Sequence, residues 1–152
     1  MAVLLIAEHN NYDLKAFTLN AATAASQIDG DLHAIIIGHN CGDASKKLSE
    51  LPLIKKVISV DAPHYENFTA ENFAPVITKV AENYTHIVCS ANTFGKNLMP
   101  RIAAHLDSSQ VSDIIKVISQ DTFLRPIYAG NAFATVKTND SKKCITVRPT
   151  SF

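Results

Sequence analysis

The sequence is poor in the residue patterns that mark metal sites, disulfide frameworks and binding of polyanions. Its three cysteines, Cys41, Cys89 and Cys144, are odd in number and far apart, so they form neither a disulfide framework nor a zinc-binding pattern. The histidines also lack metal-ligand spacing. Acidic and basic residues balance at 14 each, and no basic stretch is interleaved with aromatic residues. We therefore expect no metal site and no nucleic-acid partner.

Long apolar runs and the motifs of several enzyme classes are also absent. No apolar run approaches the roughly 20 residues that span a bilayer, so we expect no direct membrane insertion. The first residues already read as a strand, which is not the pattern of a signal or transit peptide, and we expect a bacterial-type cytoplasmic protein. The G-x-S-x-G motif of hydrolases is missing. The G-x-G-x-x-G fingerprint is missing as well, which argues against a self-sufficient NAD or FAD domain.

The apolar runs that are present predict a single α/β domain over residues 1–152. With 47% hydrophobic residues, the chain can bury a substantial core. Four apolar runs predict buried strands, and an amphipathic stretch after each of them predicts a helix. The predicted strands are 2–7, 32–37, 55–60 and 86–90, and the predicted helices are 14–28, 43–51, 69–83 and 96–106. This alternation predicts right-handed crossovers and a doubly wound, mostly parallel sheet of the Rossmann-like type.

Local signals add finer expectations for the helix ends. Asp13 is expected to cap the first helix, and Thr69 with Asn72 resembles a capping box. Pro75 should lie near the first turn of its helix, and Pro100 should lie near the first turn or kink its helix, since proline lacks the amide hydrogen that a helix interior uses.

After residue 107 the chain predicts short strands without long helices between them. These strands are 112–119, 122–128, 131–138 and 143–148. Turn-forming residues separate them, so we expect the last three to form an antiparallel meander joined to one edge of the parallel sheet. Pro126 cannot donate a ladder hydrogen bond, so its strand should be bulged or peripheral.

His9 and Lys96 are the candidate ligand contacts. Each follows a predicted strand, at the carboxyl edge where open α/β sheets bind ligands. Helix amides and a lysine favour an anion, which raises the hypothesis of an adenine-nucleotide-binding module of universal-stress type. The remaining elements of a P-loop are absent, so the alternative is an ordinary turn with a solvated lysine and a surface histidine. A third hypothesis is a small enzyme that uses His9 or Cys89; otherwise Cys89 is a buried hydrophobe.

Arg125, Tyr128 and Asn131 flank the turn RPIYAGN and have two interpretations. One is hairpin chemistry, because Gly130 supplies a positive φ angle and Asn131 tolerates one. The other is a subunit contact, because arginine and tyrosine are enriched at interface hot spots.

Four segments together resemble the amino-terminal domain of the electron transfer flavoprotein α subunit. They cover nearly the whole chain in order and read LLIAEHNNYDLKAFTLNAATAA, NYTHIVCSANTFGKNLMPRIAAHLD, SDII with DTFLRPIYAGNAFATVKT, and TVRPTSF. The resemblance implies a three-layer α/β/α domain, related to the adenine nucleotide α-hydrolase-like folds, from a subunit about twice as long. It also implies a heterodimer with a β subunit, in which one FAD is held mainly by the carboxy-terminal domain that is absent from this sequence.

The same resemblance implies a role in electron transport and fatty acid β-oxidation. Members of this family accept electrons from acyl-CoA and other dehydrogenases and pass them to a quinone oxidoreductase. For this chain we expect a scaffold that docks the β subunit, no catalytic residue, and no FAD bound by these residues alone. A eukaryotic, processed member would lie in the mitochondrial matrix.

Overall fold

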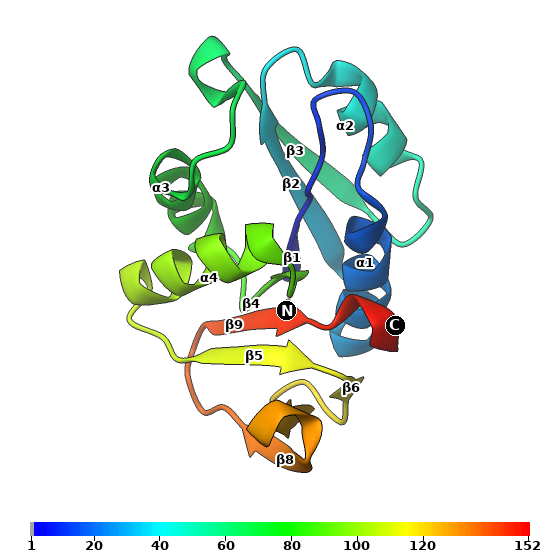
Figure 1. Ribbon diagram of the computed structural model, residues 1–152. Helices are drawn as coiled ribbons and strands as arrows, with labels where there is room; N and C mark the ends of the chain where they lie inside the picture. The colour runs from blue at the N-terminus through cyan, green and yellow to red at the C-terminus, as the bar shows by residue number, and fades with distance from the viewer. Residues whose placement is uncertain (1) are drawn as a thin grey trace.

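A computed structural model describes residues 2–152 and shows a parallel sheet between two layers of helices (Figure 1). The six strands lie in the order β3-β2-β1-β4-β9-β5, and every neighbouring pair is parallel. Their bounds are β1 Val3–Ile6, β2 Leu32–Gly38, β3 Lys56–Asp61, β4 His86–Ser90, β5 Gln110–Ile114 and β9 Lys143–Val147. The four helices are α1 Ala16–Ile28, α2 Gly42–Ser49, α3 Ala70–Ala81 and α4 Thr93–His105. The predicted three-layer, doubly wound fold is confirmed.

Strand β1 shows how the sequence builds the two layers. Successive side chains of a strand point to opposite faces, and all four residues of β1 are at most 3% exposed. Val3 and Leu5 belong to the apolar cluster that includes α1 and α2, whereas Leu4 and Ile6 belong to the cluster that includes α3 and α4. A strand covered on both faces needs apolar residues at every position, which explains the uninterrupted run VLLI.

A separate three-stranded antiparallel sheet lies beyond β5, at the bottom of Figure 1. It consists of β6 Lys116–Val117, β7 Thr122–Ile127 and β8 Ala132–Lys137, and the one-turn helix η2 Tyr128–Gly130 joins β7 to β8. Pro126 of β7 pairs with Phe133 of β8 on one side. β6 pairs only with Phe123 and Leu124, so β7 is an edge strand at Pro126. The predicted antiparallel meander is therefore present.

The membership of that meander differs from the prediction. The strand predicted at 112–119 corresponds to two separate strands, β5 and β6, and β5 contains a bulge between Val111 and Ile114 at which Asp113 has a φ of 59°. The last predicted strand leaves the meander altogether, because β9 runs in the parallel sheet between β4 and β5. Its residues Cys144–Val147 are buried, as a strand covered on both faces requires.

Two finer predictions about the helix ends are wrong. α1 begins at Ala16, and its N-cap residue is Lys15. Asp13 does not cap α1 and forms an ion pair with Lys47. Thr69 precedes α3 but makes no side-chain capping bond, so the capping box does not form.

The prolines are also placed differently. Pro75 and Pro100 lie inside α3 and α4, beyond their first turns. Both prolines are exposed, as are Glu71 and Lys96 four residues earlier, so water can reach the carbonyl groups that lose their helical partners.

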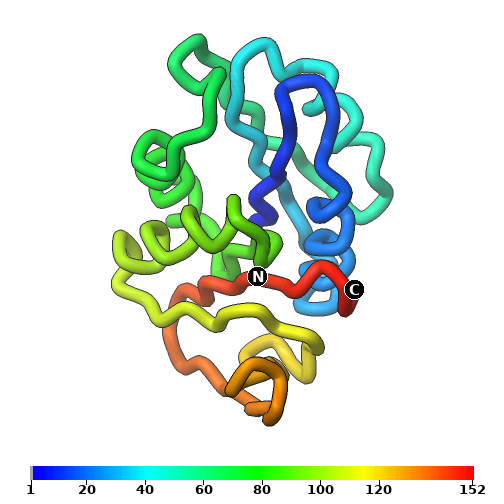
Figure 2. The backbone as a smooth tube through the Cα atoms, in the orientation of Figure 1, coloured from blue at the N-terminus to red at the C-terminus, as the bar shows by residue number. Residues whose placement is uncertain are grey.

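The chain ends beside α1. The last residues form the short helix η3 Pro149–Ser151, drawn in red in Figure 2, and the Asn20 side chain of α1 donates a hydrogen bond of 2.6 Å to the Phe152 carbonyl. Residues 149–152 are therefore held against the layer that contains α1.

Gly95 allows α4 to approach β4 closely. A Cβ atom at position 95 would collide with the Ser90 carbonyl oxygen and would lie 2.8 Å from the Cys89 sulfur. The backbone of β4 cannot move away from this contact, because β4 is held between β1 and β9.

We therefore predict that Gly95→Ala lowers the free energy of unfolding by roughly 3 kcal/mol, because overpacking forces α4 away from the sheet. The measurement is urea unfolding followed by circular dichroism. Gly42→Ala is the matched control, since nothing lies within 4 Å of a Cβ atom at that first residue of α2. Equal stabilities for the two variants would contradict the close approach.

Candidate functional site

The carboxyl edge of β1 and β4 is the topological switch point of the sheet. From β1 the chain proceeds to β2 and β3 on one side, and β4 begins the other side. Glu8 and His9 follow β1, and Asn92 follows β4 as the N-cap residue of α4. Open α/β sheets bind ligands at such a crevice.

A cavity of about 400 Å³ opens at this edge, on the side covered by α3 and α4. Residues from the loops after β1 and β3, from α3 and from the start of α4 form most of its walls. The lining residues are Glu8, His9, Asn10, Asn11, Ile37, Tyr65, Glu66, Asn67, Phe68, Phe73, Thr93, Phe94 and Asn97. We call this the carboxyl-edge cavity.

His9 lines the carboxyl-edge cavity, but both of its ring nitrogens are bonded within the protein. The Asn11 backbone N–H donates to Nδ1 at 2.9 Å, so Nε2 must carry the proton and donate to the Ile37 carbonyl at 2.7 Å. Burial lowers the pKa of His9 from its ordinary value of 6.5, and the bond to Ile37 and the charge of Glu8 oppose this shift. His9 is thus a neutral imidazole that fixes the loop after β1 to β2.

Asn11 connects three loops at the carboxyl edge and was missed by sequence reasoning. Its side chain accepts a hydrogen bond from the His39 amide at 3.0 Å and donates one to the Glu66 carbonyl at 3.1 Å. Its φ of 72° is one that asparagine adopts more readily than most residues. The Asn-Asn pair after the first apolar run is the signal that could have indicated such a turn.

Glu8 and Asn92 join β1 to α4, and sequence reasoning also missed this contact. The Asn92 side chain accepts a hydrogen bond from the Gly95 amide at 3.1 Å, which caps α4. Its Nδ2 group donates to a carboxylate oxygen of Glu8. The two residues are 84 positions apart, so no local pattern in the sequence could reveal the pair.

Lys96 does not line the carboxyl-edge cavity. It is exposed in the first turns of α4 and stands outside the set of residues that form the walls. The structure thus brings His9 to the cavity but does not bring Lys96 to it.

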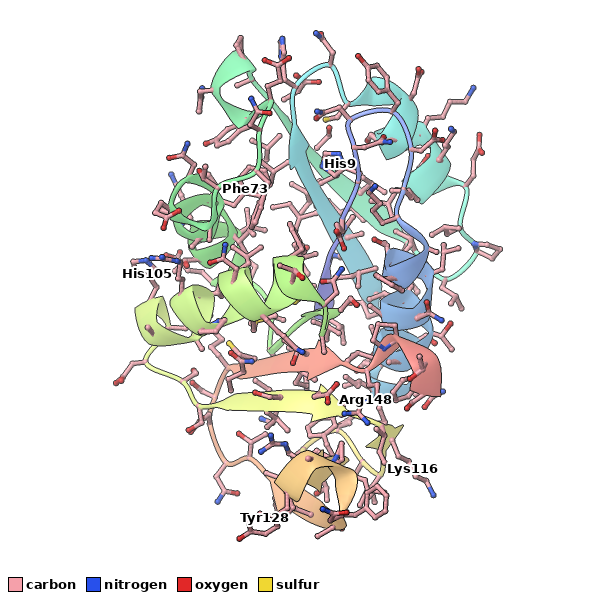
Figure 3. All side chains as sticks on the ribbon, in the orientation of Figure 1. His9, Phe73, His105, Lys116, Tyr128 and Arg148 are labelled. Carbon is pink, nitrogen blue, oxygen red and sulfur yellow. The ribbon has the colours of Figure 1, made fainter. Side chains whose placement is uncertain are left out.

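The three residues of the predicted subunit contact lie on β7 and in its connection to β8. Arg125 is half-buried, and its Nε group donates a hydrogen bond of 2.8 Å to the Ser112 carbonyl. Asn131 is exposed, and Tyr128 is 79% exposed. Figure 3 shows Tyr128 at the opposite end of the molecule from His9.

The cysteines do not form a reactive site. All three are free and buried, and burial raises the pKa of the Cys89 thiol, the neighbouring Cys144 adding to the shift. Within residues 2–152 no group of His, Cys, Asp or Glu side chains is placed to hold a metal ion. In the same residues no helix has the length and apolarity needed to cross a membrane.

A family model described as the electron transfer flavoprotein domain matches residues 3–152. The chain belongs to the electron transfer flavoprotein family. Among similar proteins, the electron transfer flavoprotein subunit alpha of Pseudomonas aeruginosa is 47% identical over 152 residues, which are 100% of this chain and 49% of the relative. The counterpart from Bradyrhizobium diazoefficiens is 46% identical over 100% of this chain and 48% of the relative.

A mitochondrial electron transfer flavoprotein subunit alpha from Dictyostelium discoideum is 43% identical, over 98% of this chain and 44% of the relative. Relatives from bacteria and from a mitochondrion thus match almost the whole chain. The chain spans about half the length of the curated relatives it matches.

The lowered pKa of the half-buried His9 predicts a pH dependence of stability. Because the pKa of His9 is lowered by folding, the unfolded chain binds more protons as the pH falls below 6.5, so the free energy of unfolding contributed by this group decreases there. We expect His9→Gln to be less stable than the unaltered chain at neutral pH and to lose less further stability between about pH 7 and pH 5.

Urea unfolding at a series of pH values measures this difference. His105→Gln removes an exposed imidazole on α4 and should leave the pH dependence of the unaltered chain in place. If the free energy of unfolding of His9→Gln has the same slope against pH as that of the unaltered chain, His9 does not titrate as described.

Proposed function

We propose that residues 1–152 form the amino-terminal domain of an electron transfer flavoprotein α subunit and act as a scaffold. The observation that carries this proposal is the match of the whole chain to about half of each relative. The remaining half would hold FAD. In this role the domain has no catalytic residue of its own.

The carboxyl-edge cavity does not fit FAD, which supports this division of labour. Two of its lining residues, Glu8 and Glu66, are acidic, and no lysine or arginine lines it to pair with a pyrophosphate. An adenine-nucleotide-binding module would meet the same difficulty, because Lys96 stands outside the cavity. We therefore propose no nucleotide-binding role for this domain.

For the complete protein we propose an electron carrier that contains a β subunit and one FAD. It would accept electrons from acyl-CoA and other dehydrogenases and deliver them to a quinone oxidoreductase. Family membership supports this proposal, and the bacterial and mitochondrial relatives support the cytoplasm or the mitochondrial matrix as its location.

The three-stranded sheet is the surface that we propose for docking the β subunit. Three large apolar residues are exposed in this region: Ile118 at 51%, Phe133 at 63% and Tyr128 at 79%. Arg125 is fixed to the Ser112 carbonyl, so β7 is anchored to the bulge within β5. Exposed aromatic side chains on an ordered sheet are typical of interface hot spots.

We predict that Tyr128→Ser weakens binding of the β subunit by at least about tenfold, because an aromatic anchor is lost. The measurement is calorimetric titration of this chain with the β subunit from the same genome. Tyr12→Ser is the matched control, since Tyr12 is 64% exposed in the loop after β1. Equal losses for the two variants would rule out the three-stranded sheet as the docking surface.

We also predict that this chain alone does not bind FAD. The chain of 152 residues, mixed with FAD and passed through a gel-filtration column, should elute without the visible absorbance of flavin. The reason is that its cavity offers no cationic partner for the pyrophosphate. An equimolar yellow complex would contradict the assignment of FAD to the other half of the subunit.

A further inference from the structure

We infer that the carboxyl-edge cavity is a binding site for a small aromatic amine that carries a positive charge. This inference goes beyond the proposed scaffold role. It rests on the position of Glu8, on the charges that line the cavity and on the aromatic side chains of its walls.

Glu8 places an anion beside the amino terminus of α4, the part of this type of fold that favours ligand phosphates. The start of α4 carries the partial positive charge of a helix amino terminus. Asn92, the N-cap residue, donates a hydrogen bond from its side chain to the Glu8 carboxylate. An anionic ligand at this point would be repelled by Glu8, so the site selects against phosphate.

The Glu8 carboxylate has no cationic partner among residues 2–152. None of their lysines, arginines or histidines forms an ion pair with it. His9, the adjacent residue, is neutral because both ring nitrogens are bonded internally. A half-buried carboxylate that faces a cavity without a counter-charge is a place where a ligand ammonium group can bind.

Aromatic rings form another part of the walls. The Phe68 and Phe94 rings lie 4.6 Å apart at 49°, and the Phe68 ring meets that of Phe73 edge-on at 5.0 Å. Phe68 is 36% exposed, so part of its ring can be covered by a ligand. Figure 3 labels His9 and Phe73, which come to this cavity from the loop after β1 and from α3. Such rings bind planar ligands and attract cations over their faces.

The size and remaining polar groups of the cavity are consistent with a small ligand. Its volume of about 400 Å³ lies at the lower end of the range for small-molecule sites. Asn67 and Asn97 add carboxamide groups that can donate or accept hydrogen bonds without adding charge. The chemistry of the walls thus combines negative charge, aromatic surface and neutral polar groups.

Two probes with the same ring and opposite charges test the inference. Tryptamine is a cation and indole-3-acetate is an anion at neutral pH, and each is titrated into the chain by calorimetry. We expect tryptamine to bind at least about tenfold more tightly, since only the cation can form an ion pair with Glu8 and a cation–π contact with the rings.

Glu8→Gln is the decisive variant, because glutamine retains an oxygen that can accept from Asn92 but removes the charge. It should weaken tryptamine binding roughly five- to tenfold and reduce the preference over indole-3-acetate. Glu50→Gln is the matched control, since it removes the same charge at the end of α2, away from the cavity, and should leave both affinities unchanged.

The inference is overturned if neither probe binds at millimolar concentration, if indole-3-acetate binds as tightly as tryptamine, or if Glu8→Gln leaves the preference intact. If circular dichroism shows that Glu8→Gln does not fold, Phe68→Leu takes its place. This variant removes a partly exposed ring but keeps an apolar side chain. It should weaken tryptamine binding by at least about threefold, and an unchanged affinity would also overturn the inference.

Discussion

The close approach of α4 to β4 is the constraint on which the carboxyl edge depends. Position 95 has no side chain, so the first turn of the helix lies against the Ser90 carbonyl. This contact places Asn92 where its side chain reaches both the Gly95 amide and the Glu8 carboxylate. The start of the helix, one wall of the cavity and the end of β1 are therefore positioned together by a single steric requirement.

The central strands could be predicted because a strand covered on both faces leaves a clear pattern. β1, β2 and β4 are continuous apolar runs, and the structure confirms them within one or two residues. β9 is also a continuous apolar run, CITV. However, it follows three predicted short strands without an intervening helix, so the sequence predicted that it belongs to the meander. The position of β9 between β4 and β5 depends on tertiary packing, and the order of segments along the chain does not reveal it.

The candidate site was less predictable, for a different physical reason. The sequence indicates that His9 stands at a strand end, but it does not indicate which loops meet there. Asn11 reaches the Glu66 carbonyl 55 positions away, and Glu8 reaches Asn92 across 84 positions. Hydrogen bonds of this kind have no period along the chain. For Lys96 the local pattern was misleading. Its position after a glycine at the start of a helix suggested a ligand contact, but its side chain is exposed to solvent.

The position of Glu8 bears on the proposed scaffold role of this domain. In an α/β fold that binds a nucleotide, the ligand anion interacts favourably with a helix amino terminus, and the empty site lacks that interaction. Here the chain's own Glu8 carboxylate accepts a hydrogen bond from the side chain of Asn92, the N-cap residue of α4, whether or not a ligand is present. The carboxyl edge can thus keep its geometry without a bound phosphate. The exposed apolar residues of the proposed docking surface, Ile118, Tyr128 and Phe133, lie in the region of the three-stranded sheet, so the proposed docking would be independent of occupation of the cavity.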